Sequence, residues 1–192
     1  VSTDDGIECY ESTNTTPEAP EVWRHIANCR ESGRQSMVME VSSQALKYQR
    51  VENLPFDVAC FLNIGRDHIS PIEHPTFEDY FESKLRIFDQ AKTAVVNLGT
   101  EEVGRVLEAA STAERLVTVG VEHPEASLWA SDVRMVGFNI EFNLHGLCAD
   151  ESEAGEKVLL GIAGDFNVEN ALVAIAAARE IGIGIEAIKK SL

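Results

Sequence analysis

The sequence predicts an α/β fold, a mostly parallel, doubly wound sheet with a small antiparallel β portion. Three observations lead to this prediction. Strand patterns alternate with amphipathic helix patterns as far as residue 120. The apolar runs in this part are continuous, which is typical of strands that are covered on both faces. Near Ala126 the pattern changes to an alternation of apolar and polar residues, which is typical of hairpin strands with one solvated face.

The first part of the chain is expected to alternate helices and strands. A helix should follow Thr16, its expected N-cap, with Pro17 in the first turn, and should end at Gly33. Residues 1–14 are polar and are expected to be irregular. The buried strands are expected at residues 37–41, 58–62, 93–99 and 116–120, and the remaining helices at residues 45–50, 77–88 and 101–110.

The antiparallel portion is expected at residues 127–162. Two strands should pair around a turn at Gly137, because apolar and polar side chains alternate on both sides of this glycine. A further apolar run and two helical patterns follow. These segments are expected as strands at residues 129–136, 138–144 and 158–162, and as helices at residues 164–182 and 186–192.

Composition excludes several classes of partner. The 192 residues carry a formal net charge of −16, which argues against nucleic acid or an anionic membrane as the main partner. No signal peptide is recognised, and no apolar run is long enough to span a membrane. Among the four scattered cysteines, Cys29 and Cys60 fall in apolar patterns and are expected to be buried thiols. Buried thiols indicate a reducing compartment. We also expect a cytoplasmic protein that is a monomer.

The stretch from residue 56 to residue 88 holds the densest group of polar side chains. A predicted buried strand ends there, and Arg66, Asp67 and His68 follow it directly. Ligands bind at the carboxyl ends of the strands in parallel sheets, so these residues form a candidate site. The next predicted helix carries Lys84 on its apolar face, where a lysine either extends to solvent along its stem or has a chemical role.

Other polar residues are open to both functional and structural interpretations. Glu40 ends a predicted buried strand, where it could bind a metal or could form a salt bridge or a cap. His68 could converge with Glu40 from the neighbouring strand end. The simplest interpretation of a third group is structural: helix capping for Asn14, Thr15, Thr16, Asn167 and Asn170, and a position on the surface for Arg50.

Five short motifs follow one another along the chain. They are Asn-Thr-Thr-Pro from residue 14, Met-Glu-Val-Ser-Ser-x-Ala-Leu from residue 39 with Arg50 after it, Phe-Asp-Val-Ala-x-Phe-x-Asn-x-x-Arg-Asp-His from residue 56, Tyr-Phe-x-x-Lys from residue 80, and Gly-x-Phe-Asn-Val-x-Asn-Ala-Leu from residue 164. In this order and spacing they resemble the central domain of the Mur ligases, ATP-dependent enzymes of peptidoglycan synthesis. The resemblance is strongest to the members that add the third residue of the peptide.

This resemblance implies a reaction. The carboxylate of UDP-N-acetylmuramoyl-L-alanyl-D-glutamate would attack the γ-phosphate of ATP, and the amino group of a free amino acid would attack the resulting acyl phosphate. Glu40, His68 and Lys84 would hold Mg²⁺, with His68 and Lys84 as the catalytic residues. Lys84 matches the lysine that CO₂ carbamylates, a change that supplies the oxygen ligands preferred by Mg²⁺. Burial would favour this step, because it lowers the pKa of a lysine and the reaction needs the neutral amine.

The resemblance also implies two groups of binding residues. One group matches contacts to the UDP-N-acetylmuramoyl-peptide, and the other matches residues near the adenosine. The first group is Asn14, Thr15, Thr16, Ser42 and Arg50, and the second is Asn167 and Asn170.

The chain departs from the family pattern in several places. Gln44 stands where many members have histidine, Asp165 stands where many have arginine, and the loop between His68 and Lys84 is longer than its commonest form. The GxxxxGK[ST] phosphate loop that the family carries upstream of Asn14 does not occur in this sequence. We therefore expect residues 1–192 to be a central domain that is truncated at its N-terminus and lacks the C-terminal domain, with an antiparallel region at 127–162.

Three alternatives remain at the level of the sequence. The first is another amide-forming ligase of the same superfamily, such as a folylpolyglutamate, cyanophycin or poly-γ-glutamate synthetase. The second is a metal-dependent hydrolase that uses Asp67, His68 and His74. The third is a catalytically inactive binding module.

Overall fold

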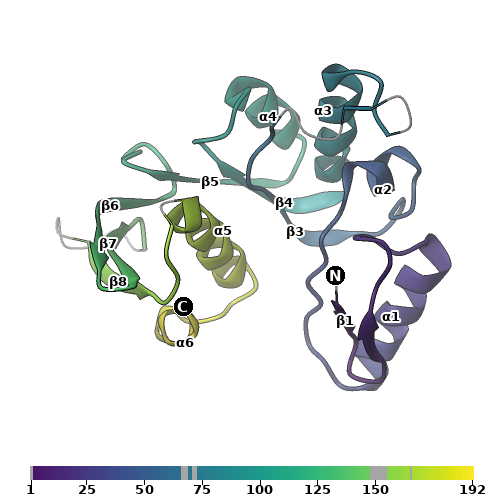
Figure 1. Cartoon of the computed structure of the whole chain (residues 1–192), viewed down its shortest axis with the longest axis horizontal. Helices are drawn as coiled ribbons and strands as arrows, with labels where there is room; N and C mark the ends of the chain where they lie inside the picture. Colours follow the sequence, from purple (N-terminus) through teal and green to yellow (C-terminus); the bar gives the residue numbers. More distant parts are fainter. Residues whose placement is uncertain (1, 66–68, 71–72, 148–154, 165) are drawn as a thin grey trace. The chain divides into compact units, whose positions relative to one another are not determined.

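The computed structural model describes residues 2–65, 69–70, 73–147, 155–164 and 166–192. The chain divides into two compact units, which are drawn in Figure 1. Unit 1 comprises Val1–Leu54 and Arg66–Ile87, and unit 2 comprises Pro55–Gly65 and Phe88–Leu192. None of the helices in the described part of the chain is both long and apolar enough to cross a membrane.

Unit 2 contains the six-stranded sheet, whose strand order is β3-β4-β5-β6-β7-β8. The pairings from β3 to β6 are parallel, and the pairings from β6 to β8 are antiparallel. The strands are β3 (Phe56–Phe61), β4 (Ala91–Asn97), β5 (Arg115–Val121), β6 (Leu128–Val136), β7 (Asn139–His145) and β8 (Glu156–Leu160). The predicted fold class and the turn at Gly137, which has a φ of +67°, are confirmed.

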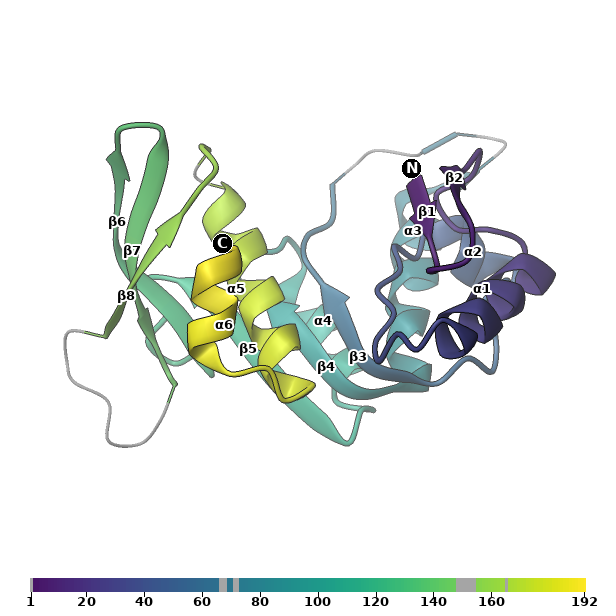
Figure 2. The same ribbon diagram turned by 90° about the horizontal axis from the view of Figure 1, so that it is seen from below.

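Helices cover both faces of this sheet. The helix α4 (Val103–Ala110) and the helix α5 (Phe166–Glu180) lie on opposite faces, as Figures 1 and 2 show from two directions. Apolar side chains of α5, among them Leu172 and Ile175, join those of the strands in the main core. The last helix, α6 (Ile185–Ser191), adds Ile188 to this core. The start of α5 therefore has a position fixed by packing.

Two predicted buried thiols lie in different environments. Cys29 is buried in unit 1, and Cys60 on β3 is half-buried in unit 2. Burial raises the pKa of the Cys60 thiol to about 11, so that it stays protonated and unreactive near neutral pH.

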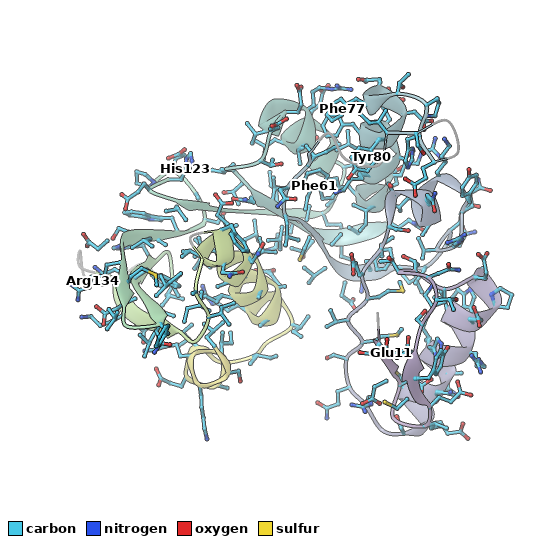
Figure 3. The ribbon with its side chains drawn as sticks, viewed as in Figure 1. Glu11, Phe61, Phe77, Tyr80, His123 and Arg134 are labelled. Atoms are coloured by element: carbon cyan, nitrogen blue, oxygen red, sulfur yellow. The ribbon has the colours of Figure 1, made fainter. Side chains whose placement is uncertain are left out.

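The described residues of unit 1 form a hairpin and three α-helices. Its elements are β1 (Ser2–Asp4), β2 (Cys9–Glu11), α1 (Ala19–Glu31), α2 (Ser43–Lys47) and α3 (Phe77–Leu85). Phe77 and Tyr80, which Figure 3 labels, lie on α3, and Phe77 stacks on Phe81. The predicted helix over 77–88 changes at Arg86 into the 3₁₀ helix η1 (Arg86–Gln90). Phe88 already belongs to unit 2, where it stacks on Phe61 of β3.

The expectation of irregular structure in residues 1–14 is wrong, because β1 and β2 pair as an antiparallel hairpin. The carboxylate of Asp5, which is only 1% exposed, accepts hydrogen bonds from the backbone of Glu8 at 2.7 Å and from Asn28 of α1 at 2.8 Å. The same carboxylate lies 2.6 Å from Nδ1 of His25, whose Nε2 is bonded to the hydroxyl of Tyr10 on β2. The hairpin therefore depends on contacts with α1 that no local pattern reveals.

The expected start of the first helix is also wrong. The N-cap of α1 is Glu18, which forms a capping box with Glu21. Thr16 lies outside the helix and is fully buried, because its hydroxyl bonds to a different segment of the chain. The buried residues of α1 are Val22, His25 and Cys29.

Residues 37–41 do not form the predicted strand. Met37 is exposed and Val38 is 96% exposed. Among the described residues, no strand pairs with this segment. An apolar run becomes a buried strand only where a neighbouring strand and a covering layer accept it, and the described part of unit 1 provides neither. Glu40 therefore does not end a buried strand, and it is exposed.

Replacing Asp5 with asparagine should lower the melting temperature more than Asp4→Asn does. The neutral amide would place a donor among groups that all donate to Asp5, whereas Asp4 lies on the surface and pairs with Arg34. Thermal unfolding of both variants, followed by circular dichroism, would measure the difference. Equal melting temperatures would show that the Asp5 contacts do not hold the hairpin.

The same variant should change the response to acid. Burial alone would raise the pKa of Asp5, but hydrogen bonds from Glu8, His25 and Asn28 outweigh it and hold the pKa well below the ordinary 3.8. Because the pKa of Asp5 is lower in the folded than in the unfolded protein, its ionised carboxylate stabilises the fold fully above pH 3.8. This stabilisation is lost as the pH falls below 3.8. Asp5→Asn should remove this part of the acid sensitivity in unfolding measured against pH.

Candidate functional site

Thr16 fixes the position of the segment that carries Glu40 and Ser42. Its hydroxyl donates to the backbone oxygen of Glu40 at 2.9 Å and accepts from the backbone nitrogen of Ser42, also at 2.9 Å. These two bonds join segments that lie more than twenty residues apart in the sequence. The hydroxyl can do both because it combines one donor with acceptor lone pairs.

Ser42 and Arg50 continue this network. The hydroxyl of Ser42 caps α2 by accepting from the backbone nitrogen of Ala45 at 3.2 Å. One terminal nitrogen of Arg50 donates to the backbone oxygen of Thr16 at 3.3 Å, and the other lies 2.8 Å from a carboxylate oxygen of Glu18. The Nε atom of Arg50 is buried and has no hydrogen-bond partner among the described residues. Arg50 is thus not the solvated surface arginine that its sequence position alone suggests.

The other two residues of the predicted substrate-binding group lie beside this network. Asn14 is exposed, and its backbone oxygen accepts from the hydroxyl of Ser12 at 2.7 Å. Thr15 is half-buried. The structure therefore joins Thr16, Ser42 and Arg50 directly and places Asn14 and Thr15 at their edge.

Glu40 and Lys84 lie within electrostatic reach of one another. Lys84 is half-buried on α3, and its Nζ lies 3.5 Å from the hydroxyl of Tyr80. Burial lowers the pKa of Lys84, and the negative charge of Glu40 partly opposes this shift. The structure thus brings together two of the three predicted metal ligands. The third, His68, lies outside the described residues, as do Arg66 and Asp67.

A second network in unit 1 was not expected from the sequence, and we refer to Ser43, His74, Asp79 and Lys47 as the Ser43 relay. The hydroxyl of Ser43 lies 2.9 Å from Nε2 of His74, and Nδ1 of His74 lies 2.6 Å from a carboxylate oxygen of Asp79. Lys47 pairs with the same oxygen at 2.6 Å. The two hydrogen bonds of His74 occupy both of its ring nitrogens, so this residue is not available as the metal ligand that a hydrolase would need.

The sequence contains only weak signs of this relay. Ser43 and Lys47 are four residues apart, which places them on one face of a helix. Thr76 caps α3 by accepting from the backbone nitrogen of Asp79 at 3.1 Å, and this spacing is a recognised helix start. Neither pattern shows that His74 would bridge the two helices.

In unit 2, the predicted adenosine residues lie in the first turn of α5. The side chain of Asn167 donates to the backbone oxygen of Ala163 at 2.6 Å, and Asn170 donates to Asn167 at 3.4 Å. Asp165, which departs from the family pattern, lies outside the described residues. The two asparagines form a local network at the helix start, but neither of these hydrogen bonds is a helix cap, because no backbone N–H donates in them.

A buried asparagine ties this first turn to the sheet. Asn97, which is 2% exposed at the end of β4, donates to the backbone oxygen of Leu62 at 3.0 Å and to Glu169 at 3.1 Å. Its side-chain oxygen accepts from the backbone nitrogen of Gly99 at 3.1 Å. A Cβ atom on Gly99 would lie 2.4 Å from an oxygen of Glu169, so a larger residue here would displace the Glu169 carboxylate. The start of α5 is thus held at the carboxyl ends of β3 and β4, where parallel sheets bind ligands.

One other group of side chains has the composition of a metal site. Single ligand atoms of Asp5, Glu8 and His25 lie within 4.8 Å of one another. The carboxylate of Asp5 is engaged by His25, Asn28 and the backbone, and Glu8 pairs with Arg24 at 2.9 Å. We therefore interpret this group as the hydrogen-bonded support of the hairpin.

The parallel strands of unit 2 and the helices on both faces of its sheet define an α/β domain. The family model described as "Mur ligase middle domain" matches residues 2–178. The chain therefore belongs to the Mur ligase middle-domain family.

The relatives agree with this assignment. The chain is 40% identical over 190 residues to UDP-N-acetylmuramyl-tripeptide synthetase of Bifidobacterium longum, covering 95% of this chain and 35% of the relative. It is 36% identical to UDP-N-acetylmuramoyl-L-alanyl-D-glutamate–L-lysine ligase of Streptococcus sanguinis, covering 98% of this chain and 36% of the relative. It thus spans about a third of the length of these curated relatives.

A solved structure shows the same fold. The structure of a UDP-N-acetylmuramoyl-L-alanyl-D-glutamate–2,6-diaminopimelate ligase superimposes with a TM-score of 0.81 and 25% identity. The superposition covers 92% of this chain and 36% of that chain.

Thr16→Val should destabilise unit 1, whereas Thr16→Ser should change it little. Valine has the same shape but leaves the Glu40 oxygen and the Ser42 nitrogen without their partner, at about 1–3 kcal/mol for an unsatisfied buried group. Urea unfolding and hydrogen exchange at the Ser42 amide would measure the loss. Exchange as slow in the valine variant as in the serine variant would contradict the role given to Thr16.

Proposed function

We propose that the full-length protein containing this chain is an ATP-dependent amide-forming ligase of peptidoglycan synthesis. It joins a free amino acid to UDP-N-acetylmuramoyl-L-alanyl-D-glutamate through an acyl phosphate. The observation that carries this proposal is the position of Lys84, a half-buried lysine with a lowered pKa within reach of the Glu40 carboxylate. Family membership supports the reaction class, and the names of the relatives support the acceptor.

The residues in unit 1 fit a magnesium site. Magnesium prefers oxygen ligands, and Glu40 offers an exposed carboxylate near Lys84. A lowered pKa increases the fraction of neutral amine at Lys84, and this form reacts with CO₂ to give a carbamate with two oxygens. Glu40, the carbamate of Lys84 and His68 would hold the ion. When bound, Mg²⁺ neutralises charge on the phosphates of ATP during transfer.

The Thr16, Ser42 and Arg50 network suits the acceptor substrate. Arg50 is held by Thr16 and Glu18, yet it keeps a buried donor without a partner. An unpaired guanidinium nitrogen is unfavourable, and a carboxylate or diphosphate oxygen of the substrate would satisfy it. Thr15 and Asn14 lie next to this network in sequence and extend the proposed contact to the muramoyl-peptide.

The first turn of α5 suits the nucleotide. Asn167 and Asn170 lie beside the carboxyl edge of the parallel strands, where Asn97 and Glu169 fix their helix. We place the adenosine of ATP there. The residues that hold the phosphates in this family belong to a loop that this sequence does not contain, so we expect the chain alone not to catalyse ligation.

The incoming amino acid is proposed to be a diamino acid. The name of the Streptococcus sanguinis relative specifies L-lysine, and the name of the solved structure specifies 2,6-diaminopimelate. Ligation assays of the full-length protein with both amino acids, and with L-alanine as a control, would identify it.

A metal-dependent hydrolase is disfavoured, because both ring nitrogens of His74 are engaged.

Arg50→Ala in the full-length protein should raise the KM for the UDP-substrate roughly 10- to 100-fold, the effect of losing a charged hydrogen bond to it. The KM for ATP should not change, because Arg50 lies among the proposed acceptor contacts. Steady-state kinetics with each substrate varied in turn would measure both values. Arg24→Ala is the matched control, since Arg24 is more exposed and pairs with Glu8. A raised KM for ATP alone would show that the two binding sites are assigned the wrong way round.

Lys84→Ala should abolish ligation, and acetate or formate should restore part of it by replacing the carbamate oxygens. Lys92→Ala is the control, because Lys92 is exposed and pairs with Asp57. Intact mass of the full-length protein with magnesium and an ATP analogue should show one added CO₂, which Lys84→Ala should remove. Normal turnover in Lys84→Ala would rule out the proposed metal site.

A further inference from the structure

The Ser43 relay fixes the positions of the protons along its length. Asp79 accepts from Lys47, and the hydrogen bonds from Lys47 and His74 hold the pKa of its carboxyl below the ordinary value. The carboxylate is therefore ionised near neutral pH and acts only as an acceptor. Its partner Nδ1 of His74, 2.6 Å away, must consequently carry a proton.

The second ring nitrogen of His74 is then an acceptor. His74 is 0% exposed, and the charges of Lys47 and Asp79 already balance one another. The ring of Tyr80 also lies beside the imidazole, with 5.3 Å between the two ring centroids. In a neutral ring that carries its proton on Nδ1, Nε2 is an acceptor. Nε2 therefore accepts, and the hydroxyl of Ser43 donates to it across 2.9 Å.

This arrangement decides what Ser43 can offer to a ligand. A serine hydroxyl has one proton and two acceptor lone pairs, and the proton is directed towards His74. Among the described residues, His74 is the hydrogen-bond partner of the Ser43 side chain, and Ser43 is only half-buried. Serine hydrolases use the same serine–histidine–aspartate order to activate the serine as a nucleophile. In this chain the order fixes the orientation of the Ser43 hydroxyl, next to Ser42.

We propose that Ser43 is a binding residue that accepts a hydrogen bond from an N–H or O–H group of the UDP-muramoyl-peptide. His74 is the positioning residue that keeps the Ser43 hydroxyl in this orientation, with Asp79 and Lys47 fixing its tautomer. This inference rests on the proposed function, because Ser43 directly follows Ser42 of the proposed acceptor contacts. Ser43 thereby adds a hydrogen-bond acceptor to a site in which the guanidinium of Arg50 supplies the hydrogen-bond donors.

Nuclear magnetic resonance tests the proton positions without any substrate. The full-length protein labelled with ¹⁵N-histidine should show His74 as the neutral tautomer protonated at Nδ1, with its signals assigned by their loss in His74→Gln. A neutral ring protonated at Nε2, or an imidazolium at neutral pH, would overturn the inference, because Ser43 would then receive a proton from His74.

Kinetics of the full-length protein test the binding role. Ser43→Ala should raise the KM for the UDP-substrate roughly three- to tenfold, as expected for one neutral hydrogen bond, and should leave the KM for ATP unchanged. Asp79→Asn should raise the same KM, and combining it with Ser43→Ala should add nothing. Additive effects would indicate a merely structural relay and would overturn the inference. Ser36→Ala, at an exposed serine of unit 1, is the matched control.

Two further outcomes distinguish the role of Ser43 from the proposed function. A wild-type protein that ligates normally, with an unchanged KM for the UDP-substrate in Ser43→Ala, overturns the role of Ser43 and leaves the proposed function in place. A wild-type protein that neither binds nor ligates any UDP-muramoyl-peptide rejects both.

Discussion

The paired hydrogen bonds of the Thr16 hydroxyl are the constraint on which the candidate site of unit 1 depends. The segment before Ser42 is exposed and has no strand partner among the described residues, so sheet pairing does not hold it. Thr16 instead bonds to it on both sides of Val41, through the oxygen of Glu40 and the nitrogen of Ser42. The start of α2 is thereby fixed, and with it the positions of Ser42 and Ser43.

The two units are stabilised in different ways. Unit 2 has a continuous apolar core between its sheet and α5, and buried polar residues such as Asn97 and His145 add hydrogen bonds to it. In unit 1, buried polar residues connect the segments, among them Asp5, Thr16, His25 and His74. Each of these joins segments that are distant in the sequence, and each is favourable only while its partners are in place. Such networks hold side chains in fixed positions, as a binding site requires.

The environment of Lys84 shows how burial and a neighbouring charge change the reactivity of a side chain. A fully solvated lysine would be protonated near neutral pH, and a lysine deep in a core would be unfavourable. Half-buried on α3 and close to the Glu40 carboxylate, Lys84 lies between these extremes. The same environment that weakens its positive charge would accept a negative carbamate once a divalent cation is present. The chain belongs to the Mur ligase middle-domain family, whereas the carbamate at Lys84 and the activity of the whole protein are proposals.

The sequence by itself determined the elements that depend on local patterns. Continuous apolar runs predicted β3, β4 and β5, alternation around Gly137 predicted the β6–β7 hairpin, and the motifs predicted the residues of the candidate site. Tertiary structure decided the rest. The β1–β2 hairpin depends on the bond between Asp5 and His25, twenty residues apart, and the predicted strand at 37–41 did not form without a neighbour. Ser43 meets His74 across 31 residues and Asn97 meets Glu169 across 72, because side-chain hydrogen bonds depend on spatial proximity, which local periodicity does not encode.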